Sequence, residues 1–441
     1  MGARVFISYA GPDVQQAKLV AKGLTSLGHD VFFAPQNLRS GDQIAGTLER
    51  EIKTRDALVL IASHNIVAKP YIEAEVAAAF NHRKRIIVLR RTDYLGSDEI
   101  DFRTKSAVWV NCGARVGDRD VRSVSRGLEE IASSKKIVVA SLNLKGGTGK
   151  TTLCGNIFAA ISEVSPQPVL MIDLDPQHNL TQLLLRTTRA ERAREADRAV
   201  LSLFEPSQIS DPVSESPANT MEIRTEDTRS QTSWEALIEQ PQLPAGPSVA
   251  LIVGQFEAAK YALSRDGASI DRALGRFRDS VGQLNELFPI IAIDVNPSAS
   301  AFTDAALSVA THIVAPVMPN IHSYSGVKLL CQLLKLRGRN DLVGRIIPVL
   351  TDFPSRLTVA ESDLINAIKD DPDFGARTLA VGIDHSNYLK PRNDDPQGLG
   401  YLRNNRVGTN VRTVASLLLE ELRKDALEEA AQHPDRHSGA G

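Results

Sequence analysis

A glycine-rich stretch at residues 145–152, KGGTGKTT, has the composition of a phosphate-binding loop. Glycines let backbone N–H groups turn inward around phosphate oxygens, and the N-terminus of a following helix adds partial positive charge. Lys150 has the position from which a lysine reaches the β- and γ-phosphates, and Thr151 has the position whose hydroxyl ligates Mg²⁺. The sequence therefore predicts a nucleotide site formed by Lys145, Gly146, Gly147, Thr148, Gly149, Lys150, Thr151 and Thr152.

Two carboxylate motifs follow strand-like apolar runs further along the chain. DLDPQHNLT occupies residues 173–181, and IAIDVNP occupies residues 291–297. Together with the glycine-rich stretch, they lie where an open α/β sheet binds ligands, outside the carboxyl ends of its strands. Asp294 is then the expected Walker B residue, which holds Mg²⁺ through its water shell. The combination disfavours the alternative of a glycine-rich turn with a chance lysine.

These three motifs resemble those of the ParA/MinD ATPases, a family with a deviant Walker A motif, over about residues 136–425. The resemblance implies that the nucleotide is ATP. It also implies that Lys145 crosses a dimer interface to the partner's nucleotide, which gives an ATP-sandwiched homodimer. In the same way, Asp175 is expected to orient the attacking water and Asp173 to lie near the metal. Asn296 departs from the family, which usually has proline there.

Three other interpretations of this part of the chain fit the sequence less well: a kinase, a nitrogenase reductase and a membrane sensor. A nitrogenase-reductase relative needs cysteines at an iron–sulfur interface, and Cys154 and Cys331 do not supply them. A membrane-surface helix is usually basic, whereas the last helical pattern, residues 414–431, has five acidic and two basic residues. We therefore expect no membrane partner.

Non-specific DNA is a further candidate partner, because dimers that resemble ParA often bind DNA through scattered basic residues. The candidates here are Lys335, Arg337, Arg339, Arg345, Lys390, Arg392, Arg403, Arg406 and Arg412. Such binding would be electrostatic and sensitive to salt. An ordinary solvated surface is an equal alternative, because Asp394 and Asp395 interrupt the later group.

The N-terminal part of the chain carries a separate set of motifs. VFISYAGPD at residues 5–13 resembles the first strand and turn of TIR domains, and FFAPQNLRSGDQI at residues 32–44 resembles their second strand and BB loop. LIASHNIVAKPYIEAEVAAAF at residues 60–80 is similar to their third strand and the helix that bears the family's glutamate. Expected fold determinants in the first motif are Phe6, Ser8, Tyr9 and Asp13.

TIR domains divide into enzymes that cleave NAD⁺ at the nicotinamide–ribose bond and non-enzymatic adaptors. Loss of nicotinamide leaves an oxocarbenium-like ribose, which a nearby carboxylate can stabilise. The family's glutamate follows an aromatic residue by four positions, so the resemblance assigns Glu75 as catalytic and Tyr71 as its neighbour in the NAD⁺ pocket. This spacing places both on one helical face, while Glu73 points elsewhere. Tyr71 replaces the usual tryptophan and Lys69 the usual serine, and an adaptor remains the alternative.

Two α/β units are needed to position these residues. Apolar runs alternate with helical patterns in two blocks, which predicts parallel sheets covered by helices. We expect a flavodoxin-like TIR domain at residues 1–133 and a P-loop NTPase domain with a mostly parallel sheet at residues 136–431. Residues 205–246 are rich in Ser, Pro, Glu and Thr and are expected to form a surface insertion. Residues 432–441 are expected to form a flexible tail.

Composition points to a soluble cytoplasmic protein. A net charge of −2 over 441 residues implies no general attraction to nucleic acid or anionic membranes. The three cysteines lie far apart, without metal-ligand or redox spacing, which suits a reducing cytoplasm. The chain starts on a strand-like run without signal-peptide character, and no segment has the length of a membrane span.

The combined hypothesis is a TIR NAD⁺ hydrolase regulated by an ATP-dependent dimerisation switch, with self-assembly of the TIR domains as a further expectation. Resemblance to bacterial TIR effectors associates this with bacterial defence or stress signalling. The alternative is a DNA- or cargo-positioning ATPase whose TIR domain is a non-enzymatic assembly module.

Overall fold

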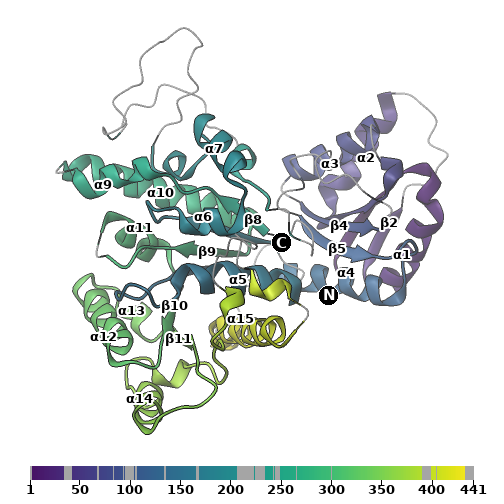
Figure 1. The fold of residues 1–441 in the computed structure, drawn as a ribbon. Coiled ribbons are helices and arrows are strands. Elements are labelled where there is room, and N and C mark those ends of the chain that lie inside the picture. Colours follow the sequence, from purple (N-terminus) through teal and green to yellow (C-terminus); the bar gives the residue numbers. More distant parts are fainter. Residues whose placement is uncertain are drawn as a thin grey trace. The chain divides into compact units, whose positions relative to one another are not determined.

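The chain folds into two compact units, one built chiefly on residues 1–134 and the other chiefly on residues 135–441. Figure 1 shows each unit as a sheet with helices packed around it. The structure is a computed structural model and describes residues 2–33, 42–66, 69–82, 84–92, 94, 104, 107–133, 136–164, 168–205, 223, 234–241, 243, 249–264, 266–298, 300–389, 399–403 and 405–432.

Five parallel strands form the sheet of the first unit, in the order β2-β1-β3-β4-β5. The elements are β1 (Arg4–Ser8), α1 (Val14–Ser26), β2 (Asp30–Phe33), α2 (Asp42–Thr54), β3 (Ala57–Ala62), α3 (Pro70–Asn81), β4 (Arg85–Arg91), β5 (Val108–Cys112) and α4 (Asp118–Ser133). This is the flavodoxin-like strand order. The fold class predicted for the N-terminal part of the chain is therefore confirmed.

Successive residues of each strand point to opposite faces of this sheet, so neighbouring residues pack against different helices. Val5 and Ile7 of β1 pack in one buried cluster with residues of α1 and α4. Phe6, between them, packs in a second cluster with residues of α2 and α3. Both faces are thus buried, which explains why the strands appear in the sequence as short continuous apolar runs.

Six strands form the sheet of the second unit, in the order β11-β10-β6-β9-β7-β8. They are β6 (Ile137–Ser141), β7 (Val169–Asp173), β8 (Val249–Ile252), β9 (Ile290–Asp294), β10 (His312–Val317) and β11 (Ile346–Leu350). The pairs β11-β10, β10-β6, β6-β9 and β9-β7 are parallel. The predicted P-loop NTPase class with a mostly parallel sheet is therefore confirmed. Apolar runs in the sequence predict five of these strands, at residues 136–140, 169–172, 290–293, 312–316 and 345–350, but not β8.

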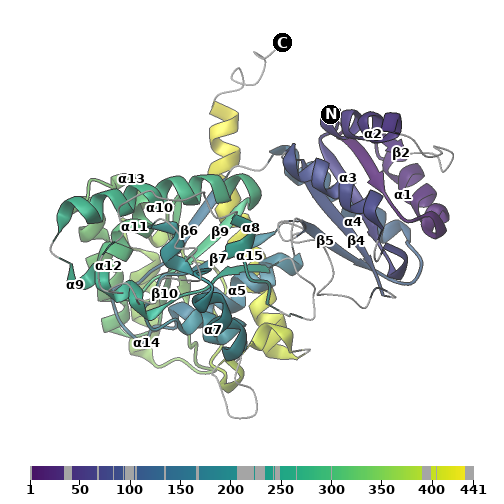
Figure 2. The ribbon, with the colours of Figure 1, turned by 90° about the horizontal axis from the view of Figure 1, so that it is seen from above.

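The helices of the second unit are α5 (Lys150–Val164), α6 (Asn179–Leu184), α7 (Thr187–Glu195), α8 (Trp234–Leu237), α9 (Lys260–Leu263), α10 (Gly267–Leu287), α11 (Ala301–Val309), α12 (Ile321–Leu336), α13 (Asn340–Val343), α14 (Val359–Lys369) and α15 (Arg406–Gln432). Helix α5 contacts β6, β7, β9 and β10, and α15 packs along α5 (Figure 2). The helix that follows the glycine-rich loop is therefore held between the sheet and the last helix of the unit.

Helix α15 starts eight residues before the pattern 414–431 predicts. The side chain of Asn405 accepts hydrogen bonds from the backbone N–H groups of Val407, at 3.0 Å, and Gly408, at 3.3 Å. An asparagine in this position satisfies N–H groups that a helix leaves free in its first turn. The first turns of α15 contain too few apolar residues for a helical pattern to be recognised there. The capping residue Asn405 therefore indicates the start of this helix better than apolar spacing does.

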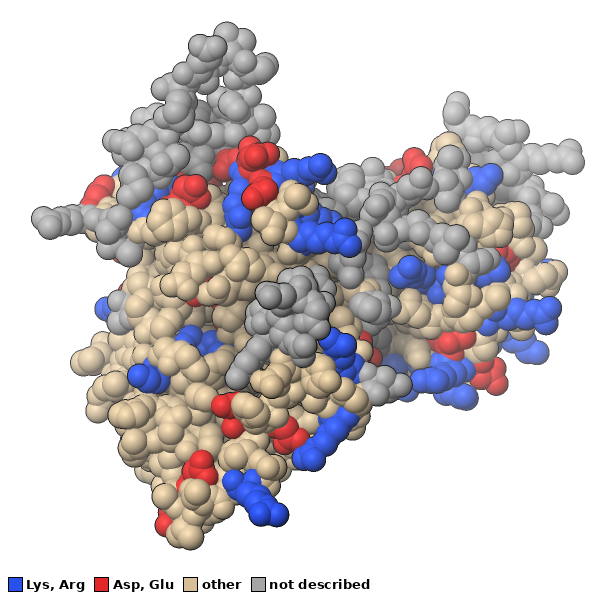
Figure 3. Space-filling view, viewed as in Figure 1, with Lys and Arg blue, Asp and Glu red and all other residues tan. Residues whose placement is uncertain are grey.

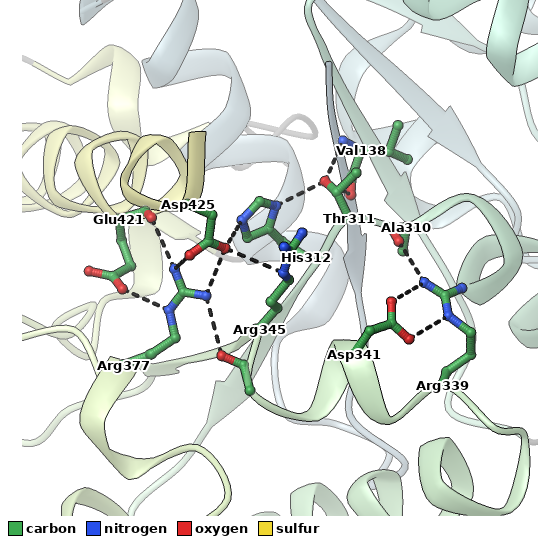
Figure 4. Close-up of polar contacts among 11 residues, drawn as sticks. Val138, Ala310, Thr311, His312, Arg339, Asp341, Arg345, Arg377, Glu421 and Asp425 are labelled. Atoms are coloured by element: carbon green, nitrogen blue, oxygen red, sulfur yellow. Dashed lines mark hydrogen bonds and ion pairs between the residues drawn. The ribbon is translucent and has the colours of Figure 1, made fainter. Parts of the chain in front are cut away.

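Arg377 ties α15 to the rest of the unit (Figure 4). Its Nε donates to Glu421 Oε1 at 2.8 Å, and its two terminal nitrogens each donate to a carboxylate oxygen of Asp425 at 3.1 Å. Asp425 also bonds Nε2 of His312, the first residue of β10, at 2.8 Å. Burial lowers the pKa of His312 to about 4. The last helix is thus fastened to the edge of the sheet where its parallel strands begin.

Candidate functional site

Three parallel strands of the second unit end at the same level. Asp294 at the end of β9 pairs in register with Ser141 at the end of β6 and with Asp173 at the end of β7. The residues that follow these strands therefore meet at one edge of the sheet, as the sequence predicts for the motifs at 145–152, 173–181 and 291–297. This is the edge where open α/β sheets bind ligands.

The glycine-rich loop has the backbone conformation that its residue types suggest. Gly147 and Gly149 have φ values of 75° and 87°, which a side chain would strain. Helix α5 begins directly afterwards at Lys150, whose Nζ donates to the carbonyl oxygen of Lys145 at 3.1 Å. Burial lowers the pKa of Lys150, opposed by the nearby carboxylates of Asp294 and Asp175. The lysine is therefore folded over the loop, next to the space that phosphates would fill.

Two residues outside the motifs hold the start of this loop, and no sequence motif predicts either of them. The side-chain amide of Asn143 donates to the carbonyl oxygens of Pro316, at 2.9 Å, and Ser323, at 3.1 Å, while its oxygen accepts from the N–H of Lys145 at 2.9 Å. A Cβ atom on Gly326 of α12 would meet the Asn143 side chain and lie 2.9 Å from Lys145 Cβ. The side chain of Lys145 is itself exposed.

Asp294 is the carboxylate best suited to a metal. Its Oδ2 accepts a hydrogen bond from the Thr151 hydroxyl at 2.7 Å, and its buried Oδ1 has no partner among the described residues. Burial, reinforced by the neighbouring Asp173, raises the pKa of Asp294 well above its usual range. An unsatisfied buried carboxylate oxygen beside a threonine hydroxyl fits Mg²⁺, which is commonly bound through few protein ligands plus water and phosphate. The described residues include no group of three His, Cys, Asp or Glu side chains that could hold a metal ion.

Asp173 is engaged differently. Its Oδ2 accepts from the backbone N–H and the hydroxyl of Thr181 at 2.8 and 2.7 Å, and its Oδ1 accepts from the N–H of Asp175 at 3.2 Å. Burial raises its pKa to about 7. A Cβ on Gly254 would lie 2.8 Å from Asp173 Cγ, so the backbone of another loop also closes on this side chain. Asp173 thus secures the loop that carries Asp175, and its place near the metal stays a prediction.

Two cavities flank the glycine-rich loop. One is a cleft of about 920 Å³, lined by Lys150, Thr151, Asp175, His178, Asn296 and neighbouring residues. The other is a cavity of about 270 Å³ lined by Gly147, Thr152, Met318, Ile383, Leu389 and others, and its surface is mostly apolar although polar side chains also line it. The first has the polar groups that a polyphosphate needs, and the second suits a flat apolar group such as a nucleobase. Asn296, the departure from the family motif, accepts from the hydroxyl of Ser298 at 2.7 Å on the rim of the cleft.

In the first unit, the candidate catalytic carboxylate is buried. Glu75 lies on α3 with 9% of its surface exposed, whereas Glu73 on the same helix is exposed. The Ser8 hydroxyl donates to Glu75 Oε2 at 2.6 Å, and burial raises the pKa of Glu75 to about 7. Tyr71, one turn before Glu75, is 46% exposed. The sequence predicts Ser8 only as a fold determinant, but it contacts the candidate catalytic group directly.

The turn after β1 is fixed by a second buried acid. Asp13 accepts hydrogen bonds from the Ser63 hydroxyl at 2.5 Å, from Asn65 at 3.2 Å and from Arg91 at 2.6 Å. These partners come from the ends of β3 and β4. Asp13 therefore connects three neighbouring strands. Tyr9 stacks on Phe33 with ring centroids 5.1 Å apart, and burial raises its pKa, reinforced by Glu75 and Tyr71.

Most candidate DNA-binding residues are already engaged. Lys335 pairs with Asp373 at 3.1 Å, Arg337 with Asp304 at 2.9 Å, and Arg406 with Asp384 at 3.2 Å. The remaining described candidates also have partners. Figure 4 shows Arg339 paired with Asp341, and Arg345 near Asp425. Arg403 lies over the ring of Tyr388, and Arg412 donates a hydrogen bond to the carbonyl oxygen of Tyr401. On the face in Figure 3, basic side chains of the second unit are interspersed with acidic ones.

Several sequence predictions lie outside the described residues. These are most of the BB-loop motif, including Gly41, most of the expected insertion at 205–246, the basic residues Lys390 and Arg392, and residues 433–441 of the tail. Within the described residues, no helix is both long and apolar enough to cross a membrane. All three cysteines are described and buried, and none of them forms a disulfide bond.

Comparison with known proteins finds two families along the chain. The TIR domain family matches residues 5–126, and the AAA domain family matches residues 134–341. The ParA family protein pGP5-D of the Chlamydia psittaci virulence plasmid is 56% identical over 43 residues, which cover 10% of this chain and 17% of that protein. The chromosome-partitioning ATPase Soj of Thermus thermophilus is 26% identical over 225 residues, 51% of this chain and 72% of that protein.

A solved plasmid partition protein from Borrelia burgdorferi superposes with a TM-score of 0.44 at 17% identity, covering 65% of this chain and 99% of that one. The chain spans less than two thirds of the length of some curated relatives, such as the Chlamydia protein. The two family matches follow one another without overlap and coincide with the two sheets described above. This chain thus joins an N-terminal TIR domain to a P-loop ATPase domain of the ParA/MinD type.

Proposed function

We propose that the protein is a TIR NAD⁺ hydrolase whose activity is controlled by ATP-dependent dimerisation of its ATPase domain. The observation that carries the proposal is the buried carboxyl group of Glu75, held by the Ser8 hydroxyl at 2.6 Å on the helix that also presents Tyr71 to solvent. A solvated surface glutamate would have neither the burial nor the partner. A carboxyl group with a strongly shifted pKa at such a position is typical of functional sites.

In this proposal, Glu75 acts in its ionised form. Breaking the bond between nicotinamide and ribose leaves positive charge on the ribose, and an anion in a poorly solvated site stabilises that charge more than it would in water. The hydrogen bond from Ser8 fixes one carboxylate oxygen and leaves the other available to the sugar. Tyr71 has the position to pack beside the ribose.

The ATPase domain would bind ATP and Mg²⁺ at the edge where β6, β7 and β9 end. Lys150 and the loop N–H groups would hold the phosphates, while Thr151 and Asp294 would hold the metal. Mg²⁺, when bound, neutralises charge on the β- and γ-phosphates. Asp175 lies half-buried in the same cleft and would orient the attacking water. The apolar cavity on the other side of the loop would accommodate the base.

Dimerisation would provide the switch. The Lys145 side chain is exposed, while its backbone is clamped by Asn143 and Gly326. A lysine presented in this way is free to contact a nucleotide held by a second copy, so ATP would join two chains. The resulting proximity of two TIR domains is the proposed activating event, and bacterial defence or stress signalling is the proposed setting.

Incubation of the purified full chain with NAD⁺, followed by chromatography of the products, tests the proposal. Wild type should release nicotinamide, more so with ATP and Mg²⁺, and Glu75→Gln should not. No nicotinamide release by wild type in any nucleotide state, with ATP hydrolysis intact, would refute NAD⁺ cleavage.

A second candidate is an ATPase that positions DNA or other cargo, with TIR domains that only assemble. It is supported by the partitioning relatives, Soj above all. The pairing of Lys335, Arg337 and Arg406 with carboxylates counts against a free basic surface. ATP-dependent, strongly salt-sensitive DNA binding without loss of NAD⁺ would favour this candidate. Such binding should then weaken for all sequences alike in Arg403→Glu and Arg406→Glu.

A further inference from the structure

His178 has an unusual backbone conformation at the nucleotide cleft. Its φ is 47°, in the left-handed region that residues with a side chain seldom adopt. It lies just before α6, and its N–H donates to the carbonyl oxygen of Asp175 at 2.7 Å. Its side chain lines the cleft together with Lys150, Thr151 and Asp175. A strained residue in such a place is a reason to look for a function of its side chain.

One hydrogen bond defines which ring nitrogen of His178 carries the proton. Nδ1 lies 3.3 Å from the carbonyl oxygen of Pro176, which can only accept. Nδ1 is therefore the protonated nitrogen, and Nε2 keeps its lone pair. Nε2 has no hydrogen-bond partner in the part of the chain that the structure describes. The ring thus offers an acceptor to the cleft and is only partly buried.

The surroundings keep this imidazole neutral. Partial burial lowers its pKa, and Arg194 of α7 lowers it further. The Pro176 carbonyl, Asp175 and Glu257, the last from the turn Phe256–Ala259, act in the opposite direction without reversing the shift. At neutral pH the ring is therefore an acceptor of hydrogen bonds at Nε2. It is not a cation that would bind phosphate by charge.

We propose that Nε2 of His178 accepts a hydrogen bond from the water that attacks the γ-phosphate, so that His178 and Asp175 together orient this water. The inference rests on the proposed ATP hydrolysis. In that reaction the water oxygen forms a bond to the γ-phosphorus, the bond from that phosphorus to the bridging oxygen breaks, and ADP leaves with the electron pair. The water proton ends on the released phosphate, so His178 orients the water without keeping the proton.

Three variants test this role. His178→Gly removes the imidazole and suits the left-handed backbone, so the fold should be retained. It should lower kcat for ATP by about tenfold or more while KM changes little, because only water positioning is lost. His178→Asn tolerates the same backbone and keeps a side-chain acceptor, so it should fall between wild type and His178→Gly. Asp197→Gly is the matched control, since Asp197 has a φ of 51° but lies outside the cleft lining, and its kcat should equal that of wild type.

The outcomes separate the inference from the function on which it rests. If wild type hydrolyses ATP and His178→Gly has the same kcat, the assignment of His178 is wrong and the ATPase proposal stands. A loss of nucleotide affinity equal to the loss of kcat/KM would also overturn it, because the imidazole would then bind the ground state. Absence of hydrolysis by wild type, with nucleotide bound, would overturn both.

Discussion

Asp173 and Asp294 end neighbouring parallel strands in exact register, yet their carboxylates are in opposite hydrogen-bonding states. Asp173 is saturated by Thr181 and the N–H of Asp175, while Asp294 keeps one buried oxygen without a partner among the described residues. The same residue type at the same level of the sheet thus has two tasks. Asp173 stabilises a loop, whereas Asp294 is the residue that we propose as a Mg²⁺ ligand.

Substitution of each by asparagine should separate these tasks. Asp294→Asn should reduce Mg²⁺-dependent ATP hydrolysis by about a hundredfold or more with little loss of stability, because Oδ1 has no hydrogen bond to lose and the asparagine oxygen can still accept from the Thr151 hydroxyl. Asp173→Asn should lower the stability of the ATPase domain by about 1–3 kcal/mol, because an amide cannot accept from all three donors. Steady-state ATPase assays and thermal unfolding measure the two effects. Equal destabilisation by both variants would contradict this division.

The phosphate loop yields a second prediction. Lys150→Ala should abolish productive ATP binding, since it removes the buried ammonium group next to the phosphate space. Asp175→Ala should bind ATP and dimerise but hydrolyse it slowly, because only the orientation of water is affected. Fluorescent nucleotide titration and size-exclusion chromatography with ATP distinguish the variants. Hydrolysis by Asp175→Ala at the wild-type rate would show that this carboxylate is misassigned.

Two glutamates on α3 form a matched pair for NAD⁺ cleavage. Glu75→Gln is nearly isosteric and neutral, so it should fold and lose nicotinamide release. Glu73→Gln changes an exposed side chain and should have almost no effect. If the two variants exchanged these phenotypes in the nicotinamide assay, the catalytic face of the helix would be the other one.

The pH dependence of the TIR domain follows from the pKa of Glu75, which burial raises from 4.5 to about 7. If the anion is the active form, NAD⁺ cleavage should increase with pH through this region. The hydrogen bond from Ser8 lowers this pKa, so Ser8→Ala should move the acid limb of the rate profile to higher pH. Ser26→Ala is the control, because among the described residues Ser26 donates only to the Gly23 carbonyl of its own helix, and its profile should match wild type.

The same pKa affects stability. Between pH 4.5 and about 7 the folded domain holds a proton on Glu75 that the unfolded chain releases. The stabilisation linked to this proton is thus fully present below pH 4.5 and is lost as the pH rises through about 7. Above pH 7, Glu75→Gln should therefore be more stable than wild type, by at most roughly 3 kcal/mol, with little difference near pH 4. Denaturant unfolding of both proteins at the two pH values measures this.

The last prediction links the two domains. Because few residues separate α4 from β6, an ATP-joined dimer should raise the effective concentration of the TIR domains, to roughly the millimolar range. NAD⁺ cleavage should rise with ATP, rise further in Asp175→Ala, where the dimer persists, and fall in Lys145→Ala. The rate is measured against nucleotide state at fixed protein concentration. Identical rates throughout would refute coupling and leave both separate activities in place.

The motifs and most strands could be predicted because they depend on local sequence. Apolar runs such as Ile290–Asp294 are visible without knowledge of their neighbours, and the glycines at 147 and 149 are required by backbone conformation. The clamp of Asn143 and Gly326 could not be predicted in this way. It depends on contacts between the loop and α12, which lies more than 170 residues later in the sequence. The different states of Asp173 and Asp294 likewise depend on Thr181 and Gly254, which no spacing rule identifies.

The anchoring of α15 also bears on how the protein is made. Residues up to 133 are sufficient for all five strands of the TIR sheet, so this domain can fold while the rest of the chain is still on the ribosome. The ATPase domain is complete only when α15 has emerged, has packed along α5 and has joined Asp425 to Arg377 and His312. Under the proposed function, synthesis from the N-terminus delivers the NAD⁺-cleaving domain before its switch. Control by ATP-driven pairing is then also a safeguard during translation, since a nascent chain with a folded TIR domain does not yet have the ATP-dependent means of pairing it.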